Sequence, residues 1–194
     1  MLGWLKHRNE TQKQANALYL ALIDKIREPV FYEKLGVPDT LDGRFDLMFA
    51  HAALIFERLA GIKTRESQKL SQALFDAIFR NMETSLREIG IGDMGVPRHI
   101  KRMMVAGKGR ALSYGEALQN KNREELASAL RRNLYGTTIE LAPETLSVMT
   151  SYMIACANHM QGIAQENLLA AIASLPSADK FADTKETITW VNAA

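Results

Sequence analysis

A cluster of cations in the middle of the chain is the most distinctive set of side chains that could bind a ligand. No acidic residue lies between Asp93 and Glu116, so no neighbour along the chain neutralises these charges. The cluster consists of Arg98, Lys101, Arg102, Lys108 and Arg110, and two methionines, Met103 and Met104, lie among them. Because methionine packs adaptably against irregular apolar surfaces, the basic segment (residues 98–110) could receive a partly folded polypeptide or an anionic surface. A solvated basic face of a helix is the alternative interpretation.

A second set of polar residues repeats every seven positions inside an otherwise apolar stretch. Arg44, His51 and Arg58 fall on one line of a helix expected over residues 43–60. Such a line is either the solvent-exposed stripe of a mostly buried helix or a polar track across a concave partner-binding face.

Residues in an arrangement typical of catalysis or metal binding are not evident. The four histidines are scattered: His7, His51, His99 and His159. None has a His or Cys partner at metal-ligand spacing. The pair Gly107–Lys108 lacks the glycine and the Ser/Thr that would complete a phosphate-binding loop. Cys156 falls on the apolar side of a predicted helix, where a small buried hydrophobe is the simpler interpretation. The sequence therefore predicts no enzyme, no cofactor and no metal site.

Length and composition predict one folded domain. A chain of 194 residues can bury a substantial core, and its 47% hydrophobic and 24% charged residues are ordinary for a globular protein. The net charge of +2 is too small to make nucleic acid the default partner, and no DNA partner is expected. The single cysteine excludes an internal disulfide. The longest uncharged run, residues 145–165, is too rich in Ser, Thr, Asn and Gln to predict a membrane-spanning helix.

The N-terminal residues have the composition of a weak membrane-surface contact. Leu2, Trp4 and Leu5 lie beside Lys6 and Arg8, but the apolar stretch is too short for a signal peptide. A single short peptide of this kind binds lipid weakly. A frayed terminus is the alternative interpretation.

Helical spacing of apolar residues dominates the chain up to its C-terminal tail. The pattern predicts an all-α, single-domain, irregular bundle of about six to seven helices over residues 1–194. We expect helices over residues 10–27, 43–60, 65–89, 96–106, a further one ending near 119, one over 123–135 and a last long one beginning at Pro143. Gly107 and Gly109 are expected to break the helix of the basic segment. The segment would then be a helix–turn–helix connection.

Local residue patterns add detail to two of these predicted helices and to the tail. Asn122, three residues before Glu125, is a typical capping start for the helix over 123–135. The last long helix has apolar residues spaced alternately by three and four, which favours packing within the chain. These residues are Leu146, Met149, Met153, Cys156, Met160 and Ile163. Trp190 indicates that the tail after Pro176 docks on the body of the protein.

A series of short motifs resembles the ubiquinol–cytochrome c chaperone family. In chain order the motifs are Phe75–Asp76, Arg87–Gly90, Gly92–Asp93, Lys101–Arg102, Gly109–Arg110 with Ala111 and Tyr114, and Leu126–Gly136. The apolar stretch over residues 45–61 also looks like an earlier helix of that family. The resemblance covers a core of about residues 30–140 and leaves the C-terminal helix and tail, residues 143–194, outside it.

The resemblance implies an all-α assembly chaperone with no catalytic site. Its client would be newly made cytochrome b, on the way to the cytochrome bc respiratory complex (complex III). A ribosome or a small partner subunit would be a further partner. The location implied is the cytoplasm, with peripheral contact to the cytoplasmic face of the inner membrane. The candidate client contacts are Arg98, Lys101, Arg102, Met103, Met104, Lys108, Arg110 and Tyr114. The alternative function is a ribosome- or RNA-binding or general protein-interaction module that uses the same basic segment.

Overall fold

The computed structural model of the chain describes the backbone of residues 2–88, 90, 92 and 95–191, and side chains from residue 9 onward within these ranges. All regular structure in these ranges is helical, which confirms the predicted all-α fold. The helices are α1 (Leu2–Ile26), α2 (Val30–Glu33), α3 (Leu41–Ile62), α4 (Arg65–Glu88), α5 (Val96–Gln119), α6 (Arg123–Asn133), α7 (Pro143–Met160), the 3-10 helix η1 (Gln165–Asn167), α8 (Leu168–Ala173) and α9 (Ala178–Thr184). Ile89 and Asp93, which belong to the predicted helix end and to a family motif, lie outside the described residues.

The predicted number of helices is too low because three short helices were missed. The short helices α2, α8 and α9, of four, six and seven residues, are too short to show a helical period in the sequence. In the opposite direction, the predicted break at Gly107 and Gly109 is wrong, because α5 continues through both glycines. A glycine inside a helix costs only about 1 kcal/mol relative to alanine, and packing of α5 against α3 can offset that cost.

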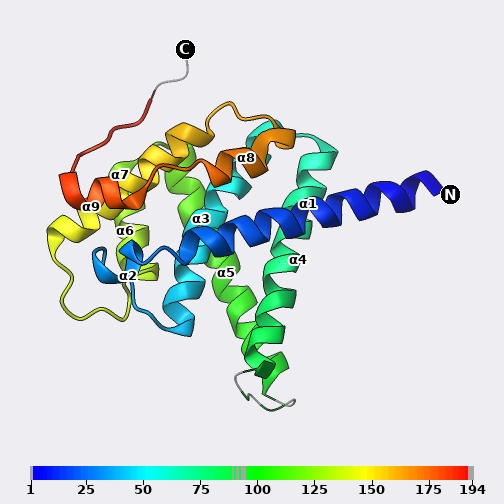
Figure 1. The fold of residues 1–194 in the computed structure, drawn as a ribbon, viewed down its shortest axis with the longest axis horizontal. Coiled ribbons are helices and arrows are strands. Elements are labelled where there is room, and N and C mark those ends of the chain that lie inside the picture. The colour runs from blue at the N-terminus through cyan, green and yellow to red at the C-terminus, as the bar shows by residue number, and fades with distance from the viewer. Residues whose placement is uncertain (1, 89, 91, 93–94, 192–194) are drawn as a thin grey trace.

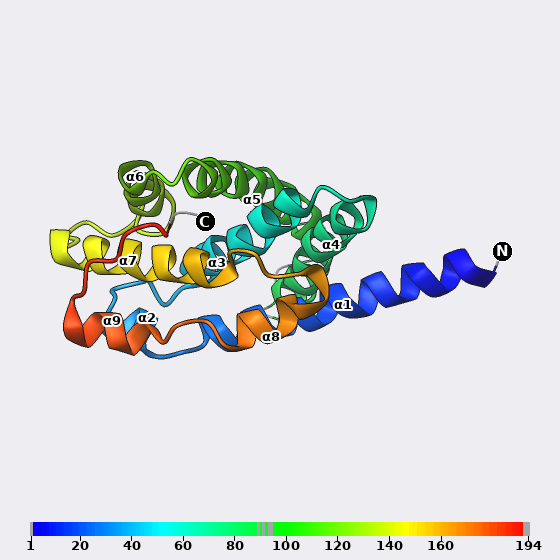
Figure 2. The ribbon, with the colours of Figure 1, turned by 90° about the horizontal axis from the view of Figure 1, so that it is seen from above.

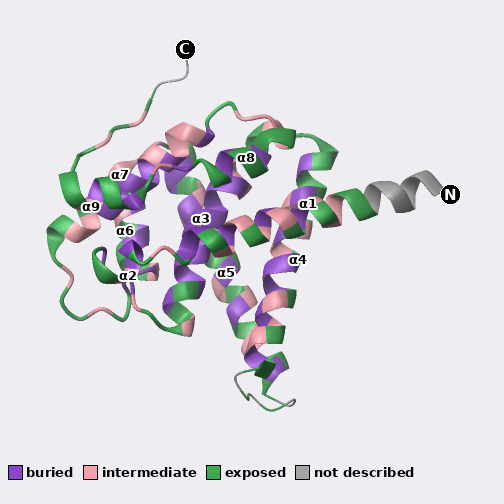
Figure 3. Ribbon diagram, viewed as in Figure 1, coloured by how far each residue is buried: buried purple, intermediate pink, exposed green. Residues whose placement is uncertain are grey.

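Helix α3 lies at the centre of three layers of helices. Seen from above, α5 and α6 form one layer, α7, α3 and α4 the middle one, and α9, α2, α8 and α1 the third (Figure 2). Every residue of α3 from Phe45 to Ile55 is buried (Figure 3). This burial explains why the helix is apolar nearly all round, as its sequence predicts. In Figure 1, α1 crosses α4 and lies beside α8, which belongs to the other end of the chain.

The close packing of α3 and α5 depends on the absence of a side chain at Gly107. A Cβ atom there would lie 2.6 Å from Cζ of Phe49 and 3.1 Å from Cζ of Phe79. Both rings are held by other rings: the Phe45 and Phe49 centroids are 4.7 Å apart, and those of Phe75 and Phe79 are 4.8 Å apart. The rings therefore have little room to move, and Gly107 allows α5 to approach the aromatic cluster.

The remaining predicted helices are present, although α1 begins at Leu2 instead of residue 10 and α7 ends at Met160, before Ile163. Oδ1 of Asn122 accepts a hydrogen bond of 3.1 Å from the backbone N–H of Glu125, which caps α6 as expected. The tail is bonded to the body, since Lys121 and Arg123 donate to the carbonyls of Val191 and Ile188 at 2.6 Å and 2.9 Å. Over residues 2–88 and 95–191, no helix combines the length and the apolarity needed to cross a membrane.

The contact at Gly107 predicts opposite effects for two neighbouring glycines of α5. Gly109→Ala should raise the free energy of unfolding by about 1 kcal/mol, because a Cβ at this exposed position meets nothing within 4 Å and alanine favours helix. Gly107→Ala should be less stable than Gly109→Ala by about 1–3 kcal/mol, the usual cost of overpacking a core. Urea denaturation of both variants measures the difference. Equal stabilisation by the two substitutions would contradict the proposed role of Gly107.

Candidate functional site

Three cations of the basic segment lie together on the outward face of α5. Arg98, Lys101 and Arg102 are spaced by three and four residues, which places them on one side of a helix, and all three are exposed. Arg102 donates a hydrogen bond of 3.0 Å to Nδ1 of His99. Among the described residues, none of the three forms an ion pair with a carboxylate. Their charge is therefore available to a ligand.

The apolar members of the predicted contact set are less accessible. Met103 is 6% exposed and Tyr114 is fully buried, and both belong to the hydrophobic core. Tyr114 thus offers no surface to a partner, and Met103 reaches only the lining of a hollow between α3, α5 and α6. Met104 is half-buried and packs against the core, so only part of its side chain reaches the surface.

Arg110 is occupied by a partner from another helix. Its Nε lies 2.5 Å from Oδ1 of Asp46 on α3, and its guanidinium lies 5.4 Å from the ring centroid of Phe45. Burial raises the pKa of Asp46 to about 6, although the charge of Arg110 acts in the opposite direction. The sequence shows no acid near the basic segment, but the fold supplies one. Arg110 therefore holds α5 against α3 and is not a free contact residue.

The predicted polar line along α3 does not form one surface. Arg44 is exposed and donates to Asp39 at 2.6 Å, whereas Arg58 is half-buried and donates to the carbonyl of Ile163 at 2.6 Å. His51, between them, has no exposed surface. Both the solvent stripe and the partner-binding track are therefore wrong as interpretations, because the middle residue belongs to the core.

His51 is kept neutral by burial and is fixed in place by two hydrogen bonds. Its Nδ1 lies 2.9 Å from the carbonyl oxygen of Leu47, and its Nε2 lies 2.8 Å from the hydroxyl of Tyr152. Nδ1 must donate to the carbonyl, so Nε2 accepts from the tyrosine. Burial lowers the pKa of His51 to about 4 and raises that of the Cys156 thiol, one turn after Tyr152, to about 12. An imidazole and a thiol in these states fit a structural role.

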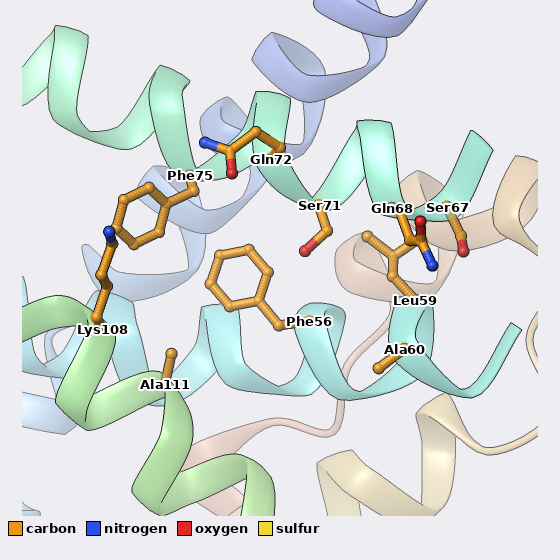
Figure 4. A pocket seen from close by; sticks show the side chains of 10 residues that line it. All are labelled: Phe56, Leu59, Ala60, Ser67, Gln68, Ser71, Gln72, Phe75, Lys108 and Ala111. Atoms are coloured by element: carbon orange, nitrogen blue, oxygen red, sulfur yellow. The ribbon is translucent and has the colours of Figure 1, made fainter. Parts of the chain in front are cut away.

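An apolar groove lies on one side of the outward face of α5. It has a volume of about 490 Å³. Its lining comes from α3, α4 and α5 and consists of Phe56, Leu59, Ala60, Ser67, Gln68, Ser71, Gln72, Phe75, Lys108 and Ala111 (Figure 4). The ammonium of Lys108 lies 5.9 Å from the ring centroid of Phe75. Sequence reasoning missed this groove, because its residues come from three helices and only Lys108 among them was predicted to contact a partner.

A polar hollow of about 400 Å³ lies on the other side of α5. It is lined by α3, α5 and the C-terminal end of α6, and it contains Arg102, Arg110 and Arg132 together with Asp42 and Asp46. The carboxylates compensate part of the positive charge. Neither in this hollow nor in the rest of the described part of the chain do His, Cys, Asp and Glu gather in groups of three or more that could hold a metal ion.

The chain is similar to a known family and to a solved structure. The family model described as ubiquinol-cytochrome C chaperone matches residues 33–175. The crystal structure of the Cbp3 homolog from Brucella abortus is similar with a TM-score of 0.75 and 30% identity, over 93% of this chain and 99% of that one. No curated protein sequence matches the chain. The family match includes α5, the groove and α7, and it extends further towards the C-terminus than the motifs indicate.

The Asp46–Arg110 pair predicts a pH-dependent loss of stability. Arg110→Met removes the cation and should cost about 1–3 kcal/mol at pH 8, because Asp46 then remains charged and buried without a partner. The pKa of Asp46 in the folded state already lies above its value in the unfolded chain, and it should rise further in the variant. The difference from wild type should therefore nearly vanish at pH 5, where the carboxyl is protonated. Urea denaturation across this pH range measures the difference in the free energy of unfolding. In the double variant Asp46→Asn/Arg110→Met, this free energy should lose the pH dependence that comes from the Asp46 carboxyl.

The His51–Tyr152 hydrogen bond predicts a second effect on stability. Tyr152→Phe leaves Nε2 of His51 buried without a donor, which should cost about 1–3 kcal/mol. Tyr19→Phe is the matched control, since the Tyr19 side chain is only half-buried, and it should change the stability by less than about 0.5 kcal/mol. Thermal denaturation at pH 7.5 compares the two variants. Equal stabilities would contradict the structural role of the bond.

Proposed function

Because the chain belongs to the ubiquinol–cytochrome c chaperone family, we propose that it binds newly made cytochrome b and promotes assembly of the cytochrome bc complex (complex III). One observation supports a role in polypeptide binding more than any other. Three exposed cations without carboxylate partners lie on the outward face of α5, and the same helix contributes Lys108 and Ala111 to an apolar groove. A membrane protein that is not yet assembled exposes both apolar helices and charged loops, and this surface matches both.

The chemistry of the buried titratable groups supports binding over catalysis. A general base needs a pKa near the working pH and access to a substrate. His51 has a pKa of about 4 and no exposed surface, and the thiol of Cys156 has a pKa of about 12 in the core. Neither group meets both requirements. The proposal therefore assigns the activity to a surface.

The cations would act mainly on encounter with the client. Exposed charges raise association rates by steering a partner of opposite charge, whereas apolar burial slows its release. Arg98, Lys101 and Arg102 would attract acidic loops of the client. In the proposal, the protein works in the cytoplasm and touches the cytoplasmic face of the inner membrane while cytochrome b is inserted. The proposal extends to a further partner, a ribosome or a small subunit, which would bind near the same face.

The proposal predicts that the exposed cations are needed for complex III assembly. In a deletion strain, cytochrome b content should fall, and the wild-type protein should restore it. The Arg98→Ala/Lys101→Ala/Arg102→Ala variant should restore it several-fold less well, because the attraction to the client is lost. Difference spectra of the b haems in isolated membranes measure the content.

A matched variant separates this surface from a general effect of charge. Arg65, Lys69 and Arg80 on α4 are also exposed, so their triple replacement by Ala removes the same charge elsewhere. This control should complement like wild type, and both triple variants should keep the wild-type circular dichroism. Unchanged b haem in the deletion strain would refute the chaperone function. A steep fall of RNA affinity with salt, together with unchanged b haem, would favour the RNA-binding alternative.

A further inference from the structure

The α3–α4–α5 groove (the ten lining residues given above) has an apolar floor and polar walls. Phe56 points into its centre from α3, and Phe75 closes one end from α4 (Figure 4). Ser71 and Gln68 reach in from the α4 side, so hydrogen-bonding groups stand beside the rings. Both phenylalanines are half-buried, although they pack against the hydrophobic core. The floor is therefore an extension of the core that reaches the surface.

The outward face of α5 carries two exposed apolar side chains beside the groove. Val105 and Leu112 are 68% and 63% exposed, and they are two of the six large apolar side chains that are exposed in the described part of the chain. They are seven positions apart and therefore lie on one side of the helix. Leu112 directly follows Ala111, which lines the groove. Both side chains neighbour Lys108 on the helix surface, three residues after Val105 and four before Leu112, so they adjoin the groove at this lining residue.

Lys108 gives this area a defined charge. Its side chain lies at the end of the groove above the ring of Phe75, where the ammonium is 5.9 Å from the ring centroid (Figure 4). Within the described ranges, no carboxylate pairs with it. Lys101 precedes it by seven positions and lies on the same side of α5. A ligand with a carboxylate near Lys108 would therefore complement the groove in charge.

We propose that the α3–α4–α5 groove receives an apolar α-helix of the client, with a carboxylate of that helix facing Lys108. This inference rests on the proposed function, because it names the part of the client that binds and the place where it binds. An amphipathic or apolar helix docks in a groove through side chains spaced by three, four and seven residues. Val105 and Leu112 lie two turns apart on α5, a separation that equals the spacing of side chains seven residues apart on a docked helix.

The shape of the site favours a helix over the surface of a bilayer. The groove is concave and about 490 Å³ in volume, so its floor is recessed between helices. A bilayer surface would touch the ridge of Leu112 and Lys108 but would leave the rings of Phe56 and Phe75 uncovered. A helix that projects side chains into the groove covers both the ridge and the floor.

Site-specific photo-crosslinking in the full-length protein tests the inference. We would place p-benzoylphenylalanine at position 60, which lines the groove from α3, or at position 112, one turn after the groove residue Lys108 on α5, and at position 20 on α1 as the control. Leu20 is 60% exposed, close to the 63% of Leu112, so the two probes are equally accessible. The expected result is a crosslink to cytochrome b, identified by mass spectrometry, from positions 112 and 60 but not from position 20.

Binding variants provide a second readout. Leu112→Asp should lower the amount of cytochrome b that co-purifies with the protein by about tenfold, since burial of a leucine side chain is worth at least that factor. Lys108→Glu should lower it similarly, whereas Lys108→Arg should retain it. Leu20→Asp, an equivalent change on α1, should leave the amount unchanged. Circular dichroism of each variant checks that the fold is preserved.

The outcomes separate this inference from the proposed function. Cytochrome b that co-purifies with wild type but crosslinks at neither position 112 nor position 60 would overturn the groove and leave the chaperone function standing. Binding to phosphatidylglycerol vesicles that Leu112→Asp abolishes, without a crosslink to cytochrome b, would assign the surface to the membrane and overturn the inference. If wild type retains no cytochrome b at all, both the function and the groove are refuted.

Discussion

The contact between Gly107 and the ring of Phe49 determines how closely α5 packs on the central helix. Because no side chain separates the two helices at this point, α5 stays continuous and its inner face sinks into the core. Met103 and Tyr114 become part of that core, and Arg110 comes within reach of Asp46. The same packing leaves the opposite face of α5 in solvent, with its cations unpaired. Without the close approach, neither the ion pair nor the exposed face would take its present form.

Helix α5 consequently separates two surfaces of different chemistry. On the side of α4 lies the apolar groove with Phe56 and Phe75, and on the side of α6 lies the polar hollow, where arginines and carboxylates partly neutralise one another. The outward face between them combines cations with exposed apolar side chains. An unassembled membrane protein presents the complementary combination of apolar helices and acidic groups. Membership of a chaperone family and this arrangement support the same function from independent observations.

The buried histidine of α3 stabilises the fold through its hydrogen bonds. His51 exchanges hydrogen bonds with Leu47 and Tyr152, and its low pKa keeps it neutral where a charge would be costly. His51 and Arg110 stand out in the sequence as candidates for chemistry or partner contact. In the fold, both are held by partners from within the protein. The groove contains mostly residues that do not stand out in the sequence at all. Binding sites between helices are commonly of this kind, since shape and apolar area matter more than reactive side chains.

The sequence by itself determined the local features of this protein. The helical period of its apolar residues, the cap at Asn122 and the all-round apolarity of residues 45–55 depend on neighbours within one or two turns, so they can be read from the chain order. The face shared by Arg98, Lys101 and Arg102 follows from the same spacing, and short ordered motifs were sufficient to indicate the family. The tertiary structure alone decided which of these residues remain accessible. Asp46 meets Arg110 and His51 meets Tyr152 across 64 and 101 positions of the chain, and the groove joins three helices. Contacts at such separations leave no periodic pattern in a single sequence, because they depend on how closely whole helices pack.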